Sequence, residues 1–121
     1  MPSRVVIADD SERFIMAARV LLEQDGMSVV GSATNSAECL HSVRELRPDL
    51  VLIDIMLGDE SGFELARRLA EEHGEERFAI ILVSTHSAAD FAELIELSPA
   101  AGFLSKSDLS AEAVRRMLHG A

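Results

Sequence analysis

Three aspartates, a serine and a lysine in this 121-residue chain could together carry out phosphoryl chemistry. Asp9 and Asp10 follow a short apolar run near the N-terminus, and Asp54, Ser84 and Lys106 come at or just after three later runs. Two carboxylates about 4 Å apart repel by roughly 4 kcal/mol at an effective dielectric of about 20, so three of them call for a cation. Mg²⁺ suits them, because it takes oxygen ligands and commonly bridges carboxylates to a phosphate. An aspartate can then attack phosphorus to form an acyl phosphate, with the serine and the lysine as donors to the phosphoryl oxygens.

These residues belong to an alternating pattern of strands and helices. Five short apolar runs predict strands, at residues 5–8, 29–31, 50–53, 79–83 and 102–104. Most of them lack polar alternation, which is typical of strands buried on both faces of a parallel sheet. In folds of this type, ligands bind beyond the carboxyl ends of the strands. The pattern therefore predicts that the acids, the serine and the lysine converge.

Amphipathic stretches after each strand predict five helices, and several of their ends are chemically marked. The first begins after Ser11, and the second stops before Pro48. The third opens with Ser61 and Glu64 in capping-box spacing and ends at Gly74. Strict alternation of strand and helix predicts a doubly wound α/β domain, built on a five-stranded parallel sheet with right-handed crossovers.

The composition favours a single domain in a reducing compartment. With 48% hydrophobic residues, a chain of this length can bury one core. Cys39 is the only cysteine, so no intramolecular disulfide can form. The formal net charge of −10 argues against direct binding to nucleic acid. We see neither a signal peptide nor an apolar run near the roughly 18 residues of a membrane span, and we expect a cytoplasmic protein without a membrane partner.

The spacing of the chemical residues resembles that of a receiver domain of the two-component response regulator family. Asp10 precedes Asp54 by 44 residues, and Gly62 follows it by 8, as in the family pattern. Ser84 and Lys106 follow Asp54 by 30 and 52 residues, again as in the family. The resemblance extends from end to end, so we expect one receiver domain over residues 1–121. It implies a flavodoxin-like fold with strand order 2-1-3-4-5 and five helices.

The resemblance also implies how phosphorylation is carried out. Asp54 is the phosphoacceptor, assisted by the hydroxyl and the ammonium described above. Mg²⁺ is held by Asp9, Asp10, Asp54 and the backbone carbonyl of Met56. Many receivers follow the lysine with a cis proline. Here a serine follows, and a cis bond before a residue other than proline costs roughly 3 to 4 kcal/mol. We nevertheless expect the bond after Lys106 to be cis, because the lysine must point into the site.

Two further pairs of residues concern the conformational switch and the lifetime of the acyl phosphate. By resemblance, Ser84 and Phe103 form a switch, in which the hydroxyl moves to the phosphoryl group and the ring turns inward behind it. Met56 and His86 flank the path by which water attacks the acyl phosphate in receivers. We expect their large side chains to slow hydrolysis by crowding that path.

The expected partners are proteins. A histidine kinase or a phosphotransfer protein supplies the phosphoryl group, and the surface of the fourth helix, fifth strand and fifth helix then signals to a downstream protein target. Residues 84–106 look most like receivers that precede a helix-turn-helix domain, and since this sequence ends at Ala121 we expect a stand-alone receiver, unless it is a piece of a longer regulator. A homodimer could form through ion pairs exchanged among Glu93, Glu96, Arg115 and Arg116. We do not expect the protein to be an enzyme, although it could catalyse its own phosphorylation from small phosphodonors and its own dephosphorylation.

Three other functions share part of the pattern. A phosphohydrolase with an aspartate nucleophile also uses Mg²⁺, but usually has a second acid where this chain has Met56. A flavin-binding electron carrier shares the strand order, but the acids that follow the first strand would repel its phosphate. The third alternative is a receiver that never becomes phosphorylated, against which the complete set of acids, hydroxyl and lysine argues.

Overall fold

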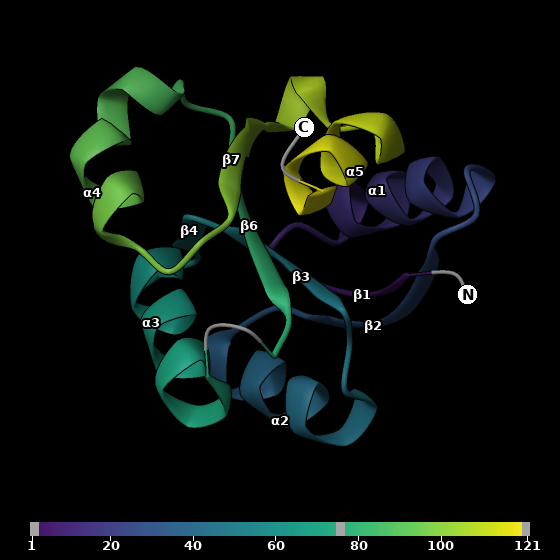
Figure 1. Cartoon of the computed structure of the whole chain (residues 1–121), viewed down its shortest axis with the longest axis horizontal. Coiled ribbons are helices and arrows are strands. Elements are labelled where there is room, and N and C mark those ends of the chain that lie inside the picture. Colours follow the sequence, from purple (N-terminus) through teal and green to yellow (C-terminus); the bar gives the residue numbers. More distant parts are fainter. Residues whose placement is uncertain (1–2, 75–76, 120–121) are drawn as a thin grey trace.

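A five-stranded parallel sheet forms the centre of the computed structural model, which describes residues 3–74 and 77–119 (Figure 1). Its strands are β1 (Arg4–Ala8), β2 (Ser28–Ala33), β3 (Leu50–Asp54), β6 (Ala79–Ser84) and β7 (Gly102–Ser105). They lie in the order β2-β1-β3-β6-β7, and every neighbouring pair is parallel. Counted along the chain within this sheet, the order is 2-1-3-4-5. The predicted fold is therefore confirmed.

Helices cover both faces of the sheet (Figure 1). The main ones are α1 (Glu12–Gln24), α2 (Ser36–Leu46), α3 (Gly62–His73) and α5 (Ala111–His119). One core cluster lies under α1 and α5, and a second lies under α2 and α3. In β1, Val5 and Ile7 belong to the first cluster, whereas Val6 and Ala8 belong to the second. Apolar side chains on both faces are what a central parallel strand requires. Within the described ranges, no helix has the length and apolar character needed to cross a bilayer.

The predicted helix caps are present. The Ser11 hydroxyl accepts the N–H of Phe14 at 3.2 Å, and the Ser61 hydroxyl accepts the N–H of Glu64 at 3.3 Å. These bonds satisfy backbone donors that the first turn of a helix leaves unpaired. At its other end, α3 is capped by Gly74, with φ of 88°. The Ser11 cap matters for the site, because it holds the first turn of α1 directly after Asp9 and Asp10.

Two features differ from the expected pattern. The fourth helix, α4 (Ala92–Leu97), has six residues, follows a 3-10 turn at Ala88–Phe91 and contains no buried side chain. Its Leu94 and Leu97 are 51% and 79% exposed. In addition, the two-residue strands β4 (Met56–Leu57) and β5 (Glu60–Ser61) form a small antiparallel hairpin between β3 and α3. Strands this short carry no periodicity from which they could be predicted.

Candidate functional site

The carboxyl ends of four strands bring the predicted site residues to one edge of the sheet. They are Asp9 directly after β1, Asp54 at the end of β3, Ser84 at the end of β6 and Lys106 directly after β7. Because neighbouring strands run parallel, all four ends point the same way, as at ligand sites of other α/β folds. The convergence predicted from the apolar runs is thus present.

The three aspartates form an acidic cluster. One carboxylate oxygen from each of Asp9, Asp10 and Asp54 lies within 4.8 Å of the other two. Asp9 is fully buried and Asp54 is 7% exposed, whereas Asp10 is exposed. Burial raises the pKa of Asp9, and the contact with Lys106 and the hydrogen bond from the Ser11 N–H offset this rise only in part.

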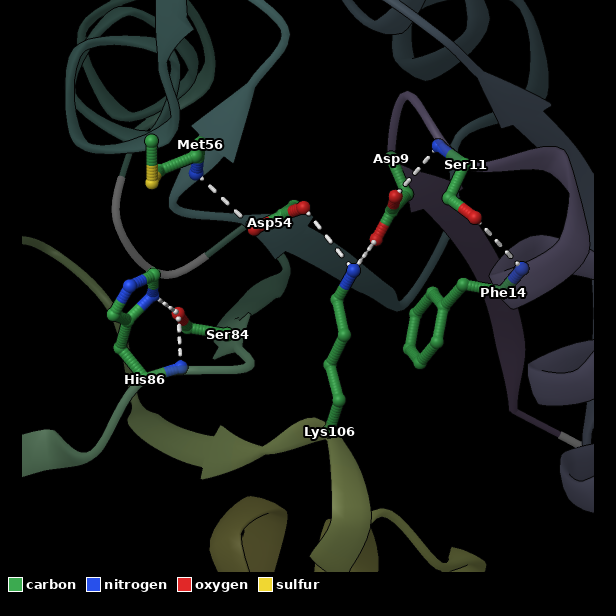
Figure 2. Close-up of polar contacts among 8 residues, drawn as sticks. All are labelled: Asp9, Ser11, Phe14, Asp54, Met56, Ser84, His86 and Lys106. Carbon is green, nitrogen blue, oxygen red and sulfur yellow. Dashed lines mark hydrogen bonds and ion pairs between the residues drawn. The ribbon is translucent and has the colours of Figure 1, made fainter.

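Lys106 places its ammonium group between two of these carboxylates (Figure 2). Its Nζ lies 2.8 Å from Asp9 Oδ2 and 3.2 Å from Asp54 Oδ2. Burial alone would lower the pKa of Lys106, but the contact with Asp9 and the negative charges of both aspartates outweigh it, so the pKa lies above its ordinary value. The lysine is therefore a fixed positive charge beside the Asp54 carboxylate.

The acidic cluster carries more negative charge than Lys106 can neutralise. Among the residues that the structure describes, three carboxylates face one ammonium, which leaves two negative charges uncompensated in a largely buried place. The buried Oδ2 of Asp9 has its ion-pair contact with Lys106 but accepts no hydrogen bond of good geometry from residues 3–74 or 77–119. Burying a carboxylate in this way is costly, and a hard cation with oxygen ligands removes the cost. The acidic cluster could therefore bind a metal ion.

Ser84 is at the predicted place, but its hydroxyl is bonded away from the aspartates. The side chain is 1% exposed, and its Oγ accepts the backbone N–H of His86 at 2.9 Å. The His86 Nδ1 lies 3.4 Å from the same Oγ (Figure 2). The exposed His86 ring packs edge-on against Phe91, with ring centroids 5.9 Å apart. Ser84 and His86 thus form one hydrogen-bonded unit at the end of β6.

Met56 lies in the hairpin that follows β3, and Phe103 lies on β7. The N–H of Met56 donates to Asp54 Oδ1 at 3.1 Å, while its side chain is 54% exposed. Phe103, on β7, is half-buried and packs against the core cluster under α2 and α3. The Asp54 carboxylate is thus held from two directions, by a backbone N–H on one oxygen and by the Lys106 ammonium on the other.

The expected cis peptide bond is not present, and that prediction is wrong. All peptide bonds in the described part of the chain are trans, including the one between Lys106 and Ser107. A 3-10 turn begins at Lys106 directly after β7, and the long side chain reaches Asp9 and Asp54 from this backbone. The lysine therefore enters the site without the cost of a cis bond.

Sequence reasoning missed one aromatic residue at the site. Phe14 lies in the first turn of α1, and the centroid of its ring is 4.3 Å from Lys106 Nζ. The signal that could have found it is its position in the first turn of a helix that begins directly after Asp9 and Asp10. Such a turn has to face the same edge of the sheet.

Comparison with known proteins identifies the family. The model of the response regulator receiver domain matches residues 5–118. The chain belongs to this family, whose members act in two-component signal transduction and are in general not enzymes. Of the alternatives raised by the sequence, only the receiver that is never phosphorylated is compatible with this membership.

Individual relatives and structures agree with the family match. The chain is 32% identical to response regulator GacA of Pseudomonas viridiflava, covering 93% of this chain and 52% of that protein. It is 31% identical to the polar-differentiation response regulator DivK of Brucella anthropi, covering 88% and 85%. Its structure is similar to the receiver domain of the NarL response regulator from Mycobacterium tuberculosis, with a TM-score of 0.83, 27% identity and coverage of 99% and 98%. The chain spans about half the length of several curated relatives that it matches.

Proposed function

We propose that this chain is the phosphoacceptor receiver of a two-component phosphorelay, in which Asp54 takes a phosphoryl group from a histidine kinase or a phosphotransfer protein. The observation that carries the proposal is the contact between Asp54 Oδ2 and Lys106 Nζ at 3.2 Å, within an acidic cluster at the edge of the sheet. A carboxylate oxygen beside a fixed ammonium can attack phosphorus while the cation stabilises the charge on the transferring group.

In this proposal Asp9, Asp10, Asp54 and the backbone carbonyl of Met56 hold Mg²⁺. The uncompensated charge of the acidic cluster and the buried Asp9 oxygen support a hard divalent cation there. When bound, the ion neutralises charge on the phosphoryl oxygens. The protein contributes the orientation of Asp54, because the Met56 N–H fixes one of its oxygens.

The switch is proposed to begin at Ser84. Its hydroxyl would leave the N–H of His86 and donate to a phosphoryl oxygen, while Phe103 turns inward behind it. The placement of the two residues supports this, since Ser84 ends β6 and the half-buried Phe103 lies on the neighbouring strand β7. The change would then bias the surface of α4, β7 and α5, where a downstream protein target reads the state of Asp54.

Intact mass spectrometry after incubation with acetyl phosphate tests the phosphorylation itself. We expect a gain of one phosphoryl group that requires Mg²⁺ and is absent in Asp54→Asn, because the amide cannot serve as the nucleophile. The variant is a close control, since asparagine keeps an oxygen for the Met56 N–H. If a histidine kinase and the small donor both fail to add a phosphoryl group, and Mg²⁺ does not bind, the chain is a receiver that is never phosphorylated.

Met56 and His86 are proposed to lengthen the life of the acyl phosphate by crowding the path of water. Both side chains are exposed at the edge that carries Asp54. In Met56→Ala and His86→Ala we expect the phosphorylated mass to decay several-fold faster after the donor is removed, since about 1.4 kcal/mol in a barrier changes a rate tenfold. Decay at the wild-type rate in both variants would contradict this role.

We also propose that the protein is cytoplasmic and that it forms a homodimer. The ion pairs invoked for a dimer need Arg115 and Arg116, and in the monomer Arg115 donates to the Asp25 carbonyl while Arg116 pairs with Glu112 at 2.6 Å. Dimerisation would therefore have to exchange these contacts. Sedimentation of the phosphorylated chain against the unphosphorylated one tests it, and a monomer in both states would contradict it.

A further inference from the structure

Within the part of the chain that the structure describes, three side chains contact the ammonium group of Lys106, and one of them is not charged. Asp9 and Asp54 contact it as ion-pair partners, and the Phe14 ring lies with its centroid 4.3 Å from Nζ (Figure 2). A cation within about 6 Å of an aromatic centroid is attracted by the electron-rich face of the ring. The attraction is stronger where water is largely excluded, and the lysine side chain is only 16% exposed.

The charged neighbours cannot hold the ammonium in place throughout the reaction. Under the proposed function, Asp9 becomes a metal ligand and an oxygen of Asp54 becomes bonded to phosphorus. Both contacts therefore weaken or change just when the ammonium has to meet the phosphoryl group. Of the three neighbours, Phe14 alone takes no part in the chemistry, so its contact can persist.

The position of Phe14 is fixed by the backbone that carries the acidic cluster. The N–H of Ser11 donates to Asp9 Oδ1 at 2.8 Å, and the Ser11 hydroxyl accepts the N–H of Phe14 at 3.2 Å. The aromatic ring is half-buried and packs against the core cluster under α1 and α5. One short segment thus sets both the metal-binding carboxylate and the ring that faces the lysine.

We propose that Phe14 is a positioning residue that keeps the Lys106 ammonium beside Asp54 while phosphoryl transfer takes place. The inference rests on the proposed function. With acetyl phosphate as donor, a bond forms between an Asp54 carboxylate oxygen and phosphorus, and the bond from phosphorus to the acetate oxygen breaks. Acetate leaves with the electron pair, and Lys106 donates a hydrogen bond to the phosphoryl group without giving up its proton. Phe14 touches none of the reacting atoms and acts through the lysine.

Three variants separate this role from ordinary packing. In Phe14→Leu, which keeps an apolar side chain but lacks the ring, we expect phosphorylation by acetyl phosphate and Mg²⁺ to slow about five-fold. In Phe14→Tyr, which keeps the ring, we expect a rate within about two-fold of wild type. Phe78→Leu removes a buried aromatic residue just before β6, far from the site, and is expected to lower stability without slowing phosphorylation.

A spectroscopic readout needs no phosphodonor. Lys106 is the only lysine of the chain, so labelling with ¹³C-lysine gives the signals of this side chain alone. We expect the protons next to Nζ to be shifted upfield by the ring in wild type and Phe14→Tyr, and to lose that shift in Phe14→Leu.

The outcomes distinguish this inference from the function on which it rests. If wild type is phosphorylated and Phe14→Leu reacts equally fast, or if Lys106 shows no upfield shift in wild type, the positioning role is wrong while the proposed function stands. If wild type accepts no phosphoryl group from any donor, both fail. A slowed Phe14→Leu, a near-normal Phe14→Tyr and the matching shifts would establish the role.

Discussion

Replacing Lys106 by methionine is expected to slow Mg²⁺-dependent phosphorylation of Asp54 by at least about 100-fold. The ammonium lies 3.2 Å from Asp54 Oδ2, within reach of a phosphoryl group attached there. Loss of one preorganised donor to a developing anion typically costs about 10² to 10³ in rate. The rate is measured as the gain of phosphorylated mass with acetyl phosphate and saturating Mg²⁺. Phosphorylation at the wild-type rate would contradict the assignment of Lys106.

The same substitution should also destabilise the metal-free protein, by about 3 kcal/mol. Methionine fills much of the same space beside Phe14, but it leaves the fully buried Asp9 without its cationic neighbour. Mg²⁺ should restore most of the loss, because it replaces the missing positive charge. Urea unfolding with and without Mg²⁺ measures both effects. Lys106→Arg is the matched control, since it keeps the charge and should keep most of the metal-free stability.

The sequence was sufficient for the fold and for the convergence of the site. Apolar runs without polar alternation marked the strands of a sheet buried on both faces, and Asp54 and Ser84 at their ends could be assigned to one edge. The caps at Ser11 and Ser61 followed from local chemistry, because a hydroxyl three residues before a free backbone N–H is a short-range signal. The strands and caps depend on residues close together in the chain, and the convergence of the site follows because all strands of a parallel sheet end at the same edge.

What could not be predicted depends on contacts between distant segments. The peptide bond after Lys106 is trans because the 3-10 turn after β7 already directs the side chain toward Asp9, and the sequence gives no measure of that direction. The ring of Phe14 meets Lys106 from 92 residues away. The hydrogen bond from the His86 N–H to the Ser84 hydroxyl is a local exception, and it was missed because the family pattern directs the serine to the phosphoryl group instead.

Replacing Gly62 by alanine is expected to lower the free energy of unfolding by about 3 kcal/mol or more, although alanine is the better helix former. Gly62 is the first residue of α3, and an added Cβ would lie 2.1 Å from the Asp54 carbonyl oxygen and 2.7 Å from Ile55 Cα. Both are backbone atoms, so the end of β3 or the start of α3 has to move. Movement also disturbs the bond from the Gly62 N–H to the Ile55 carbonyl, now 2.9 Å.

Gly102→Ala is the matched control, because its Cβ would meet a side chain instead. The nearest atom is Met117 Sδ at 2.6 Å, at the far end of a flexible chain that can turn away. We expect this variant to change stability by less than about 1 kcal/mol. Urea unfolding of both variants decides the matter, and equal stabilities would show that close packing against β3 is not what requires a glycine. Because the displaced backbone is that of Asp54 itself, Gly62→Ala should slow phosphorylation even at temperatures where it remains folded, whereas Gly102→Ala should not.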